Sequence, residues 1–348
     1  MTNASIALNA RFSVHRPTGM QRYGLELARR FGDQIQVVRP VRALRGPAGH
    51  LWEQIYLPSA LHGKLLWSPN NTGPLAVRRQ VCTMHDLIPL DQPEWFSPRF
   101  AAWYEWLLPR LAKQVRHIIA VSEFTKHRVV ELLAVPQEKV TVIPNGVDER
   151  FSPRSEEEIL CMRRSLGITC PAYLLYVGNL EPRKNLQRLL QAWAIAQRSV
   201  APEIELVVAG AKGSSLVFEE CSLGTLPARV QFTGYIADDQ LPALYAGSLA
   251  LLYPSLYEGF GLPPLEAMAC GTPVVTSAKT SLPEVVGDAA ILVDAEDAES
   301  IADAITRIAS SDSLRGELRR RGLERAKEFT WERTANLTLR LLLEQARN

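Results

Sequence analysis

Glu258-Gly259-Phe260-Gly261-Leu262-Pro263-Pro264-Leu265-Glu266 is a glycine turn that runs into prolines and carries a carboxylate at each end. Because proline suits the first turn of a helix, a helix is expected to begin near Pro263. The glycines allow a ligand to approach the backbone N–H groups, and the helix start directs unpaired amides and the positive end of its dipole to the same place. The stretch therefore predicts a cradle for phosphate and for sugar hydroxyls.

The position of Glu258 along the chain favours a ligand-binding role. It follows the apolar run Leu249–Tyr253, which predicts a buried strand, and ligands of open parallel sheets bind where the strands end. Glu266 has a plainer interpretation, because a carboxylate in the opening turn of a helix is stabilised by about 0.3–1 kcal/mol without any ligand. The pair together is best explained by function.

The rest of the chain has the pattern of a doubly wound α/β protein, with apolar runs that alternate with helical stretches. A length of 348 residues exceeds what one hydrophobic core usually supports, so two domains are expected. The polar stretch Asp148 to Arg164 is the expected linker. The predicted strands are Ser5–Ala10, Gln36–Val38, Leu65–Ser68, Val81–Met84, Ile118–Val121, Val140–Ile143, Tyr173–Val177, Glu205–Ala209, Val230–Phe232, Leu249–Tyr253, Pro273–Thr276 and Ala290–Val293.

Composition indicates the class of protein. No apolar run approaches the roughly 20 residues that span a bilayer, and the first residues lack the features of a signal peptide, so a cytoplasmic protein is expected. The 5 cysteines contain no Cys-x-x-Cys pair, which argues against a zinc knuckle or a disulfide framework.

The net charge of +2 hides an asymmetry between the two halves. Residues 1–150 carry 19 Lys and Arg against 12 Asp and Glu, and residues 151–348 carry 20 against 25. A basic first half suits an anionic partner such as a lipid-linked phosphate or the inner face of the plasma membrane, although an ordinary solvated face would look the same. The aromatic and basic residues of 98–116 suit the headgroup boundary of a membrane, but Trp103, Trp106, Leu107 and Leu111 recur at the spacing of a core helix.

The stretch from Pro254 to Val275 resembles the signature of the family 4 retaining glycosyltransferases. Further matches lie at 178–185, 232–247, 85–90 and 330–334. The resemblance implies the GT-B fold, with two Rossmann-like doubly wound domains facing a central cleft. It implies an acceptor-binding domain over 1–155, a nucleotide-sugar-binding domain over 165–329 and a final helix over 330–348 that crosses back to the first domain.

Residues 178–185 are expected to hold the donor diphosphate. Basic side chains between a strand end and a helix start can stabilise the charge that develops on a departing phosphate, and Lys184 is the first candidate and Arg183 the second. Many members of the family have an arginine where this chain has Asn179, so that part of the phosphate clamp is absent. The alternative is a solvated Arg-Lys turn.

The resemblance assigns the remaining donor contacts. Backbone groups around Tyr235 and Ile236 would read the base, Glu266 would accept the ribose hydroxyls, and Glu258 would face the donor sugar and phosphates. Gly19 would let the backbone approach the phosphates, although many relatives have two consecutive glycines there. The predicted donor-binding set is completed by Gly178, Gly259, Phe260, Gly261 and Leu262.

His85 ends a predicted strand, where a lone histidine is more often structural than catalytic. The resemblance makes it an orienting group near the sugar hydroxyls, with Asp86 either fixing its tautomer or capping the adjoining turn. The acceptor-side candidates are Arg22, Asp86, Ser122 and Lys126, and Ser122 is equally well explained as a helix N-cap.

The chain is similar to bacterial mannosyltransferases of surface polysaccharide assembly. The expected reaction moves a hexose, mannose from GDP-mannose, onto a glycan or lipid-linked saccharide with retention. No Asp-x-Asp pair occurs, so no cofactor or divalent metal is expected, and no nucleic-acid partner is expected either. The alternatives are a UDP- or dTDP-sugar donor, an epimerase or phosphorylase on a similar scaffold, and a binder without catalysis. A generic dinucleotide-binding protein is disfavoured because no Gly-x-Gly-x-x-Gly turn follows the first strand.

Overall fold

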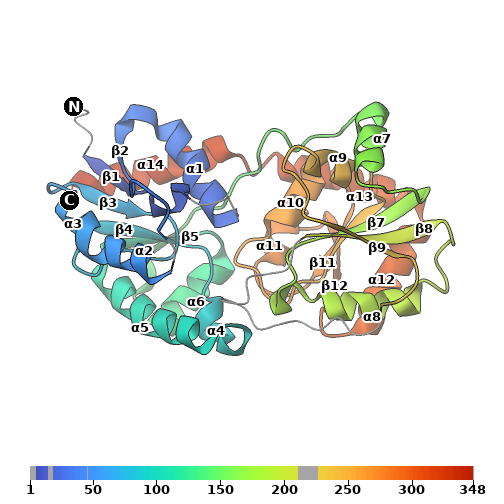
Figure 1. Ribbon diagram of the computed structural model, residues 1–348, viewed down its shortest axis with the longest axis horizontal. Coiled ribbons are helices and arrows are strands. Elements are labelled where there is room, and N and C mark those ends of the chain that lie inside the picture. The colour runs from blue at the N-terminus through green and yellow to red at the C-terminus, as the bar shows by residue number, and fades with distance from the viewer. Residues whose placement is uncertain (1–4, 15–18, 45, 211–225, 348) are drawn as a thin grey trace. The chain divides into compact units, whose positions relative to one another are not determined.

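The computed structural model describes residues 5–14, 19–44, 46–210 and 226–347, and the side chain of residue 14 is excluded from the description. The chain folds into two compact units, each built on a parallel sheet (Figure 1). The first unit comprises Met1–Pro93, Pro98–Gly146 and Phe329–Asn348, and the second comprises Glu94–Ser97 and Val147–Glu328. The first unit thus ends at Gly146, before the residue 155 that the sequence suggested.

The sheet of the first unit has the strand order β2-β1-β3-β4-β5-β6, and every neighbouring pair is parallel. Because β1 lies between β2 and β3, the order reverses at β1, and the loops that leave β1 and β3 diverge there. The strands are β1 Ile6–Asn9, β2 Ile35–Val38, β3 Leu65–Ser68, β4 Gln80–Met84, β5 His117–Ala120 and β6 Val140–Val142.

Helices cover both faces of this sheet because alternate strand residues point to opposite faces. Ile6, Leu8 and Trp67 pack with α1 and α14 in one cluster, and Cys82 and Met84 pack with α5 and α6 in another. The helical segments are η1 Arg11–Val14, α1 Gly19–Phe31, η2 Gly32–Gln34, α2 Pro47–Leu51, the π-helical η3 Trp52–Tyr56, α3 Leu57–Ser59, α4 Ile88–Asp91, η4 Pro93–Trp95, α5 Pro98–Gln114, α6 Glu123–Leu133, η5 Gln137–Lys139 and α14 Trp331–Arg347.

The sheet of the second unit has the order β12-β11-β10-β7-β8-β9, again with all pairs parallel. Its order reverses at β7, so the loops after β7 and β10 diverge. The strands are β7 Ala172–Val177, β8 Ile204–Ala209, β9 Val230–Gly234, β10 Ala250–Tyr253, β11 Val274–Ser277 and β12 Ala290–Val293.

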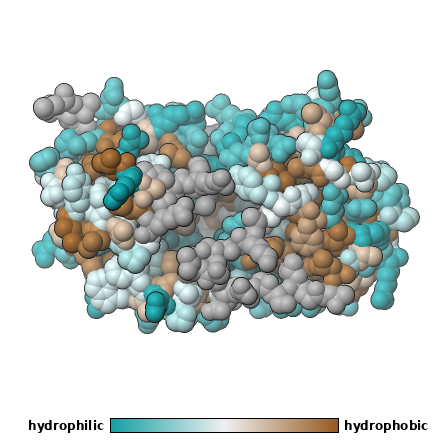
Figure 2. Space-filling model, viewed as in Figure 1, coloured by the Kyte–Doolittle hydropathy of each residue, from teal (hydrophilic) through white to brown (hydrophobic). Residues whose placement is uncertain are grey.

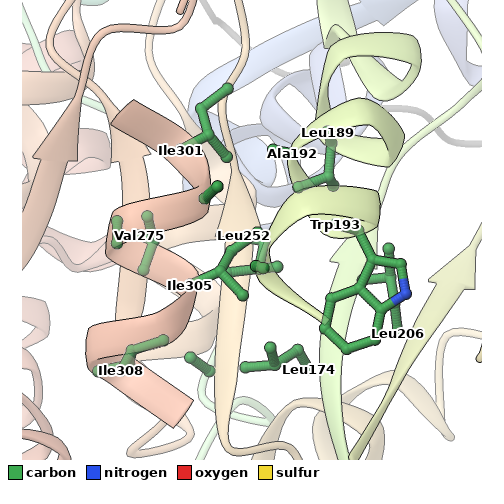
Figure 3. Close-up of a cluster of buried hydrophobic side chains, with 14 of the residues drawn as sticks. Leu174, Leu189, Ala192, Trp193, Leu206, Leu252, Val275, Ile301, Ile305 and Ile308 are labelled. Atoms are coloured by element: carbon green, nitrogen blue, oxygen red, sulfur yellow. The ribbon is translucent and has the colours of Figure 1, made fainter. Parts of the chain in front are cut away.

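One face of the second sheet is covered by α8 and α12. Trp193 and Leu189 of α8 and Ile305 of α12 pack over Leu174 and Leu252 of the sheet, all nearly inaccessible to solvent (Figure 3). The helical segments of this unit are α7 Glu156–Ser165, η6 Pro182–Lys184, α8 Leu186–Ala196, α9 Leu241–Ala246, α10 Leu262–Ala269, α11 Leu282–Val286, α12 Ala298–Ser310 and α13 Asp312–Ala326.

The expected linker from Asp148 to Arg164 is wrong over most of its length, because α7 occupies residues 156–165 and belongs to the second unit. A capping box starts this helix: the Ser155 hydroxyl accepts from the Glu158 amide, and the Glu158 carboxylate accepts from the Ser155 amide. Within the residues that the structure describes, no helix is long and apolar enough to span a membrane.

Candidate functional site

The strand order of the second unit reverses at β7, so the loops that follow β7 and β10 begin side by side at the same edge of the sheet. β7 runs into residues 178–185, and β10 runs into residues 254–261. In open α/β sheets ligands bind in the crevice that such diverging loops form outside the carboxyl ends of the strands. The fold thus brings together the two segments that the sequence singled out.

Backbone and side-chain bonds join the two loops. Asn185 has a left-handed backbone conformation, and its side-chain nitrogen donates to the carbonyls of Pro254 (2.9 Å) and Ala295 (2.6 Å). The Leu256 amide donates to the carbonyl of Arg183 (2.8 Å). These bonds hold η6, which carries both predicted cations, against the loop of Glu258.

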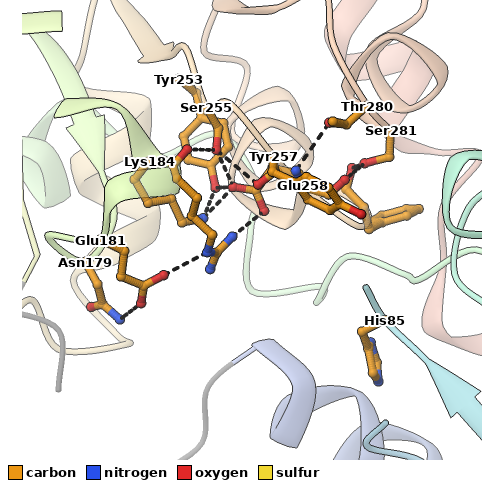
Figure 4. A network of polar contacts seen from close by, with 12 residues as sticks. His85, Asn179, Glu181, Lys184, Tyr253, Ser255, Tyr257, Glu258, Thr280 and Ser281 are labelled. Carbon is orange, nitrogen blue, oxygen red and sulfur yellow. Dashed lines mark hydrogen bonds and ion pairs between the residues drawn. The ribbon is translucent and has the colours of Figure 1, made fainter. Parts of the chain in front are cut away.

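Glu258 is the centre of a buried network of polar contacts (Figure 4). Its Oε1 lies 2.6 Å from Lys184 Nζ and accepts from the hydroxyls of Tyr253 (2.7 Å) and Ser255 (2.8 Å). Its Oε2 lies 3.0 Å from Arg183 Nη1. Lys184 Nζ also donates to the Tyr253 hydroxyl and lies 4.8 Å from the centre of that ring. One carboxylate therefore holds two cations at the strand ends.

The network changes the titration of its members. Burial alone would raise the pKa of Glu258, but the charges of Lys184 and Arg183 outweigh it and lower the pKa to about 2. Burial, with the nearby charge of Arg183, lowers the pKa of Lys184 even though Glu258 and Glu181 oppose the change. Glu258 is thus a carboxylate at any physiological pH, and it favours the charged form of Lys184.

Glu181 supplies the second carboxylate of this cluster. It is 5% exposed, and it accepts from Arg183 Nε (2.8 Å) and from the side-chain nitrogen of Asn179 (3.2 Å). At Asn179, where the family resemblance implies an arginine, the side-chain amide binds the carboxylate that orients Arg183. The two basic side chains of this loop, Arg183 and Lys184, are thus both held by carboxylates.

The glycine turn after Glu258 leads into α10, which begins at Leu262, within one residue of the predicted start. Gly261 has φ +109°, a backbone conformation that favours glycine, and a Cβ there would also come within 2.7 Å of the end of the Leu282 side chain. The Ser281 hydroxyl lies 2.8 Å from the carbonyl oxygens of both Glu258 and Phe260 and donates to them. The Glu258 amide donates to the Thr280 hydroxyl (3.2 Å). The turn is held from both sides.

Glu266 lies on α10 and is 8% exposed, with the Tyr245 hydroxyl donating to its Oε2 (3.2 Å). Tyr245 is not among the residues whose hydroxyls donate to the Glu258 carboxylate, which are Tyr253 and Ser255. Tyr235 is 67% exposed, whereas Ile236 is buried. Gly178 lies against the end of β8, because a Cβ at Gly210 would come 1.8 Å from the Gly178 carbonyl oxygen. The binding roles of these residues stay predictions.

His85 lies in the first unit, at the end of β4, and is 6% exposed. Burial lowers its pKa to about 4 against the opposing bond to Pro69, so the imidazole is neutral near pH 7. Nε2 lies 2.7 Å from the Pro69 carbonyl, and a carbonyl only accepts, so Nε2 carries the proton and Nδ1 is the acceptor. The neutral ring suits the predicted role of orienting sugar hydroxyls better than a role that requires a charged imidazolium.

The other candidates of the first unit have mixed surroundings. Ser122 is the N-cap of α6, where its hydroxyl accepts from the Thr125 amide (3.0 Å). The Asp86 carbonyl accepts from the side chain of Asn71 (3.3 Å), and Lys126 lies in the first turn of α6. Arg22 lies on α1, which begins at Gly19. Residues 15–18, which precede Gly19, lie outside the described residues.

Sequence reasoning missed the hydroxyls that surround Glu258, namely those of Tyr253, Ser255, Thr280 and Ser281. Tyr253 and Ser255 lie at the end of β10, only a few residues before Glu258. Their closeness to Glu258 could therefore be predicted from the sequence. Thr280 and Ser281 lie beyond β11, and only the tertiary fold brings them to the glycine turn.

Comparisons with known proteins agree on one family over most of the chain. The family model Glycosyl transferases group 1 matches residues 162–328, and the model Glycosyltransferase Family 4 matches residues 17–151. O-antigen chain mannosyltransferase B of Escherichia coli is 35% identical over 78% of this chain and 72% of its own length. O-antigen chain mannosyltransferase RfbU of Salmonella typhimurium is 30% identical over 70% of this chain and 65% of its own.

Other relatives are longer or more distant. The serotype-specific mannosyltransferase WbdA of Escherichia coli is 31% identical over 75% of this chain, which spans 33% of that protein. The solved structure of HepE from Anabaena with UDP-glucose has a TM-score of 0.76 at 20% identity and covers 97% of this chain and 99% of that one. The glycosyltransferase WaaG has a TM-score of 0.72 at 17% identity, with 95% and 99% covered. These two likenesses concern the fold, which is that of the GT-B enzymes. Two family models match this chain, one in each unit, and the O-antigen chain mannosyltransferase B is 35% identical to it over 72% of its own length. The chain therefore belongs to the glycosyl transferases group 1 and is a glycosyltransferase.

Proposed function

We propose that the protein transfers mannose from GDP-mannose to a hydroxyl of a glycan or lipid-linked saccharide during assembly of a surface polysaccharide, with retention of configuration. The relatives named as O-antigen mannosyltransferases support the sugar and the type of product. The observation that carries the reaction is the buried cluster in which Glu258 holds Lys184 and Arg183 at the strand ends of the second unit.

The cluster suits the departure of a nucleoside diphosphate. As the bond from the anomeric carbon to the phosphate oxygen breaks, its electron pair stays on that oxygen, and fixed cations stabilise the charge that grows there. The acceptor oxygen forms the new bond to the anomeric carbon, and its proton passes to the departing phosphate. Lys184 and Arg183 are already oriented by Glu258 and Glu181, so little reorganisation is required.

Glu258 acts in this scheme as a positioning residue. Both of its oxygens are held by cations, and a carboxylate with a pKa near 2 is a weak base and a weak nucleophile. Covalent catalysis by Glu258 therefore agrees poorly with this geometry. Front-face attack, in which the acceptor oxygen approaches the anomeric carbon from the side that the phosphate leaves, agrees with it better. Because two side-chain cations supply the charge that a metal would otherwise supply, we propose that the reaction needs no divalent metal.

The test of donor and metal dependence is the thermal unfolding of the protein across a panel of sugar nucleotides, with and without EDTA. A ligand that binds only the folded protein raises the unfolding midpoint. We expect GDP-mannose to raise it selectively, with an equal rise in EDTA. Selective stabilisation by a UDP- or dTDP-sugar would overturn the donor, and loss of the shift in EDTA would overturn metal independence. No shift with any sugar nucleotide would contradict the proposed reaction.

We also propose that the first unit touches an anionic membrane surface. On the helical stretch 47–59, Leu51, Ile55 and Tyr56 are more than half exposed, and on α5 Trp106 is 44% exposed with Arg110 over its ring. Figure 2 shows hydrophobic side chains at the surface of the first unit over α2 and α3. Apolar and aromatic side chains near basic ones are typical of helices that lie at the headgroup boundary.

Vesicle sedimentation tests the membrane contact. The protein is expected to bind vesicles that contain anionic lipid, less at high salt, and the double variant Ile55→Ser, Tyr56→Ser is expected to bind several-fold more weakly. Leu343→Ser, on a helix of the same unit and 37% exposed, is the control. Equal binding by wild type and the double variant would contradict the assignment of this surface.

A further inference from the structure

Tyr253 is the last residue of β10, immediately before the loop that carries Glu258. The neighbouring strand holds this position, because Tyr253 pairs with Thr276 of β11 and its carbonyl accepts from the Thr276 hydroxyl (2.8 Å). The tyrosine is 1% exposed, so its ring is fixed in the interior by a strand of the sheet. The proposed reaction uses the carboxylate and the two cations of the cluster, and Tyr253 has no part in it.

The hydroxyl of Tyr253 bonds both Lys184 and Glu258 (Figure 4). Burial, together with the charge of Glu258, raises the pKa of Tyr253 well above its usual value, so the hydroxyl keeps its proton. A charged ammonium group has no lone pair, so this proton goes to Glu258 Oε1 (2.7 Å). The Tyr253 oxygen then accepts from Lys184 Nζ. The hydrogen bonds therefore run in one direction, from the ammonium group to the phenol to the carboxylate.

Lys184 has three N–H donors when it is charged. Tyr253 accepts from one of them, and Glu258 Oε1, at 2.6 Å, accepts from another. Nζ also lies 4.8 Å from the centre of the Tyr253 ring, within the range at which an aromatic ring attracts a cation. Among the residues that the structure describes, Nζ has no third hydrogen-bond partner. One N–H of Lys184 is therefore left for a ligand.

Glu258 alone does not orient the ammonium group. Its Oε1 accepts from Lys184, from Tyr253 and from Ser255 (2.8 Å), more bonds than the two lone pairs of one carboxylate oxygen match. A single bond to this crowded oxygen fixes the distance of Nζ but lets the ammonium group turn about it. The Tyr253 oxygen supplies a second fixed point from a rigid strand, and so fixes the direction of the remaining N–H. Phenylalanine, which has the ring without the hydroxyl, would serve equally well for packing alone.

We propose that Tyr253 is a positioning residue for Lys184, whose ammonium group it orients so that the remaining N–H meets the departing phosphate. The inference rests on the proposed transferase function and adds a residue to the same site. Donors that are already in place when charge develops stabilise the transition state, so an orienting bond acts on it more than on donor binding. Tyr253 therefore contributes to kcat through Lys184 and has little effect on KM.

The test compares Tyr253→Phe with wild type in the release of GDP from GDP-mannose, with octyl α-mannoside as the acceptor probe. Phenylalanine keeps the ring and removes only the hydroxyl. The variant is expected to have a kcat lower by about tenfold or more, the effect of one hydrogen bond to a charged group. Its KM for GDP-mannose is expected to stay within about twofold of the wild-type value. GDP-mannose should raise the unfolding midpoints of both proteins equally, because donor binding is retained.

A double-mutant cycle with Lys184→Met measures whether the hydroxyl acts through Lys184. Methionine has no ammonium group to orient, so adding Tyr253→Phe to Lys184→Met is expected to change kcat by less than about twofold. A structural role would instead give the same further loss in both backgrounds. The control is Tyr173→Phe, which removes the hydroxyl of another buried tyrosine of this unit, one that donates to the Leu244 carbonyl (2.8 Å). It is expected to lower the unfolding midpoint and to leave kcat unchanged.

3-Fluorotyrosine in place of Tyr253 keeps the hydroxyl but makes its oxygen a weaker acceptor, so its kcat is expected to lie between those of wild type and Tyr253→Phe. This protein alone decides if Tyr253→Phe does not fold. Unchanged kcat without the hydroxyl, or an equal loss of kcat in the presence and absence of Lys184, would overturn the role of Tyr253. Failure of the proposed function looks different, because wild type itself would then release no GDP and gain no stability from GDP-mannose.

Discussion

Glu258→Gln is expected to lower kcat for mannosyl transfer by roughly 10²–10³-fold, the loss that follows when an oriented charge-stabilising group is disturbed. Glutamine keeps the size of the side chain and can still accept from Tyr253 and Ser255. It removes the negative charge that favours the ammonium form of Lys184, whose pKa burial already lowers. Lys184 then loses its proton at a lower pH, and the departing phosphate loses a cation.

The pH profile of Glu258→Gln separates this mechanism from a general loss of structure. Because activity requires the charged form of Lys184, the alkaline limb of the profile is expected to move to lower pH in the variant, and acidification restores part of kcat. Glu296→Gln is the matched control, since Glu296 is paired with Lys279 at the surface, where such pairs contribute little. Near-normal kcat in Glu258→Gln, or an unshifted profile, would contradict the role of Glu258.

Acid unfolding gives a second measurement of the same network. The pKa of Glu258 is lowered from 4.5 to about 2 in the folded protein, so its contribution to stability is complete above pH 4.5 and is lost as pH falls from 4.5 to 2. That difference corresponds to roughly 3 kcal/mol. The thermal midpoint of wild type should therefore fall more steeply over this range than that of Glu258→Gln, and parallel curves would contradict the low pKa.

The strands were readable from the sequence because each is a short apolar run. Parallel strands are buried on both faces, so they lack polar alternation and stand out from the helical stretches between them. All the predicted strands are present, with bounds that differ by a residue or two. Their order in the sheet was not readable, because strand pairing depends on contacts between residues far apart in sequence. The reversal at β7, which locates the candidate site, therefore came from the structure.

The helical segments were harder to predict where polar composition masked them. The charge-rich stretch from Asp148 to Arg164 is typical of a linker, although its Ser155 and Glu158 have the spacing of a capping box. Residues 47–59 were not assigned, yet Gly49, Glu53, Leu57 and Leu61 recur every four residues and are all buried.

The candidate site was predictable in its members but only partly in their relations. Glu258, Lys184 and Arg183 were named from strand ends and from family resemblance, and the structure brings them into direct contact. The sequence predicts that Glu258 faces the donor directly. In the structure its carboxylate bonds Lys184 and Arg183, which supports the proposal that it acts through these two cations. This could not be read from the sequence because the contact joins loops some 75 positions apart.

Gly146→Ala is expected to destabilise the first unit by about 3 kcal/mol or more, beyond the usual effect of adding one methyl group. The chain leaves the first unit after Gly146 and re-enters it at Phe329, just before α14. A Cβ at Gly146 would lie 2.1 Å from the Trp331 nitrogen and 2.4 Å from the Thr330 carbonyl carbon. Both are backbone atoms, so the clash can be relieved only by moving the start of α14 or the chain at Gly146.

Displacement of α14 would reach the core of the first unit. Trp331 packs in the cluster of β1, β3 and α1, and Thr334 donates to the Pro144 carbonyl (2.7 Å). Calorimetric unfolding of Gly146→Ala should therefore show a lower midpoint for the first unit. The control is Gly316→Ala on α13, where an added Cβ meets no atom within 4 Å and alanine favours the helix, so its midpoint should equal or exceed that of wild type. A midpoint of Gly146→Ala equal to that of wild type would mean that α14 can shift at little cost, and that the close packing of Gly146 against Trp331 does not hold this helix in place.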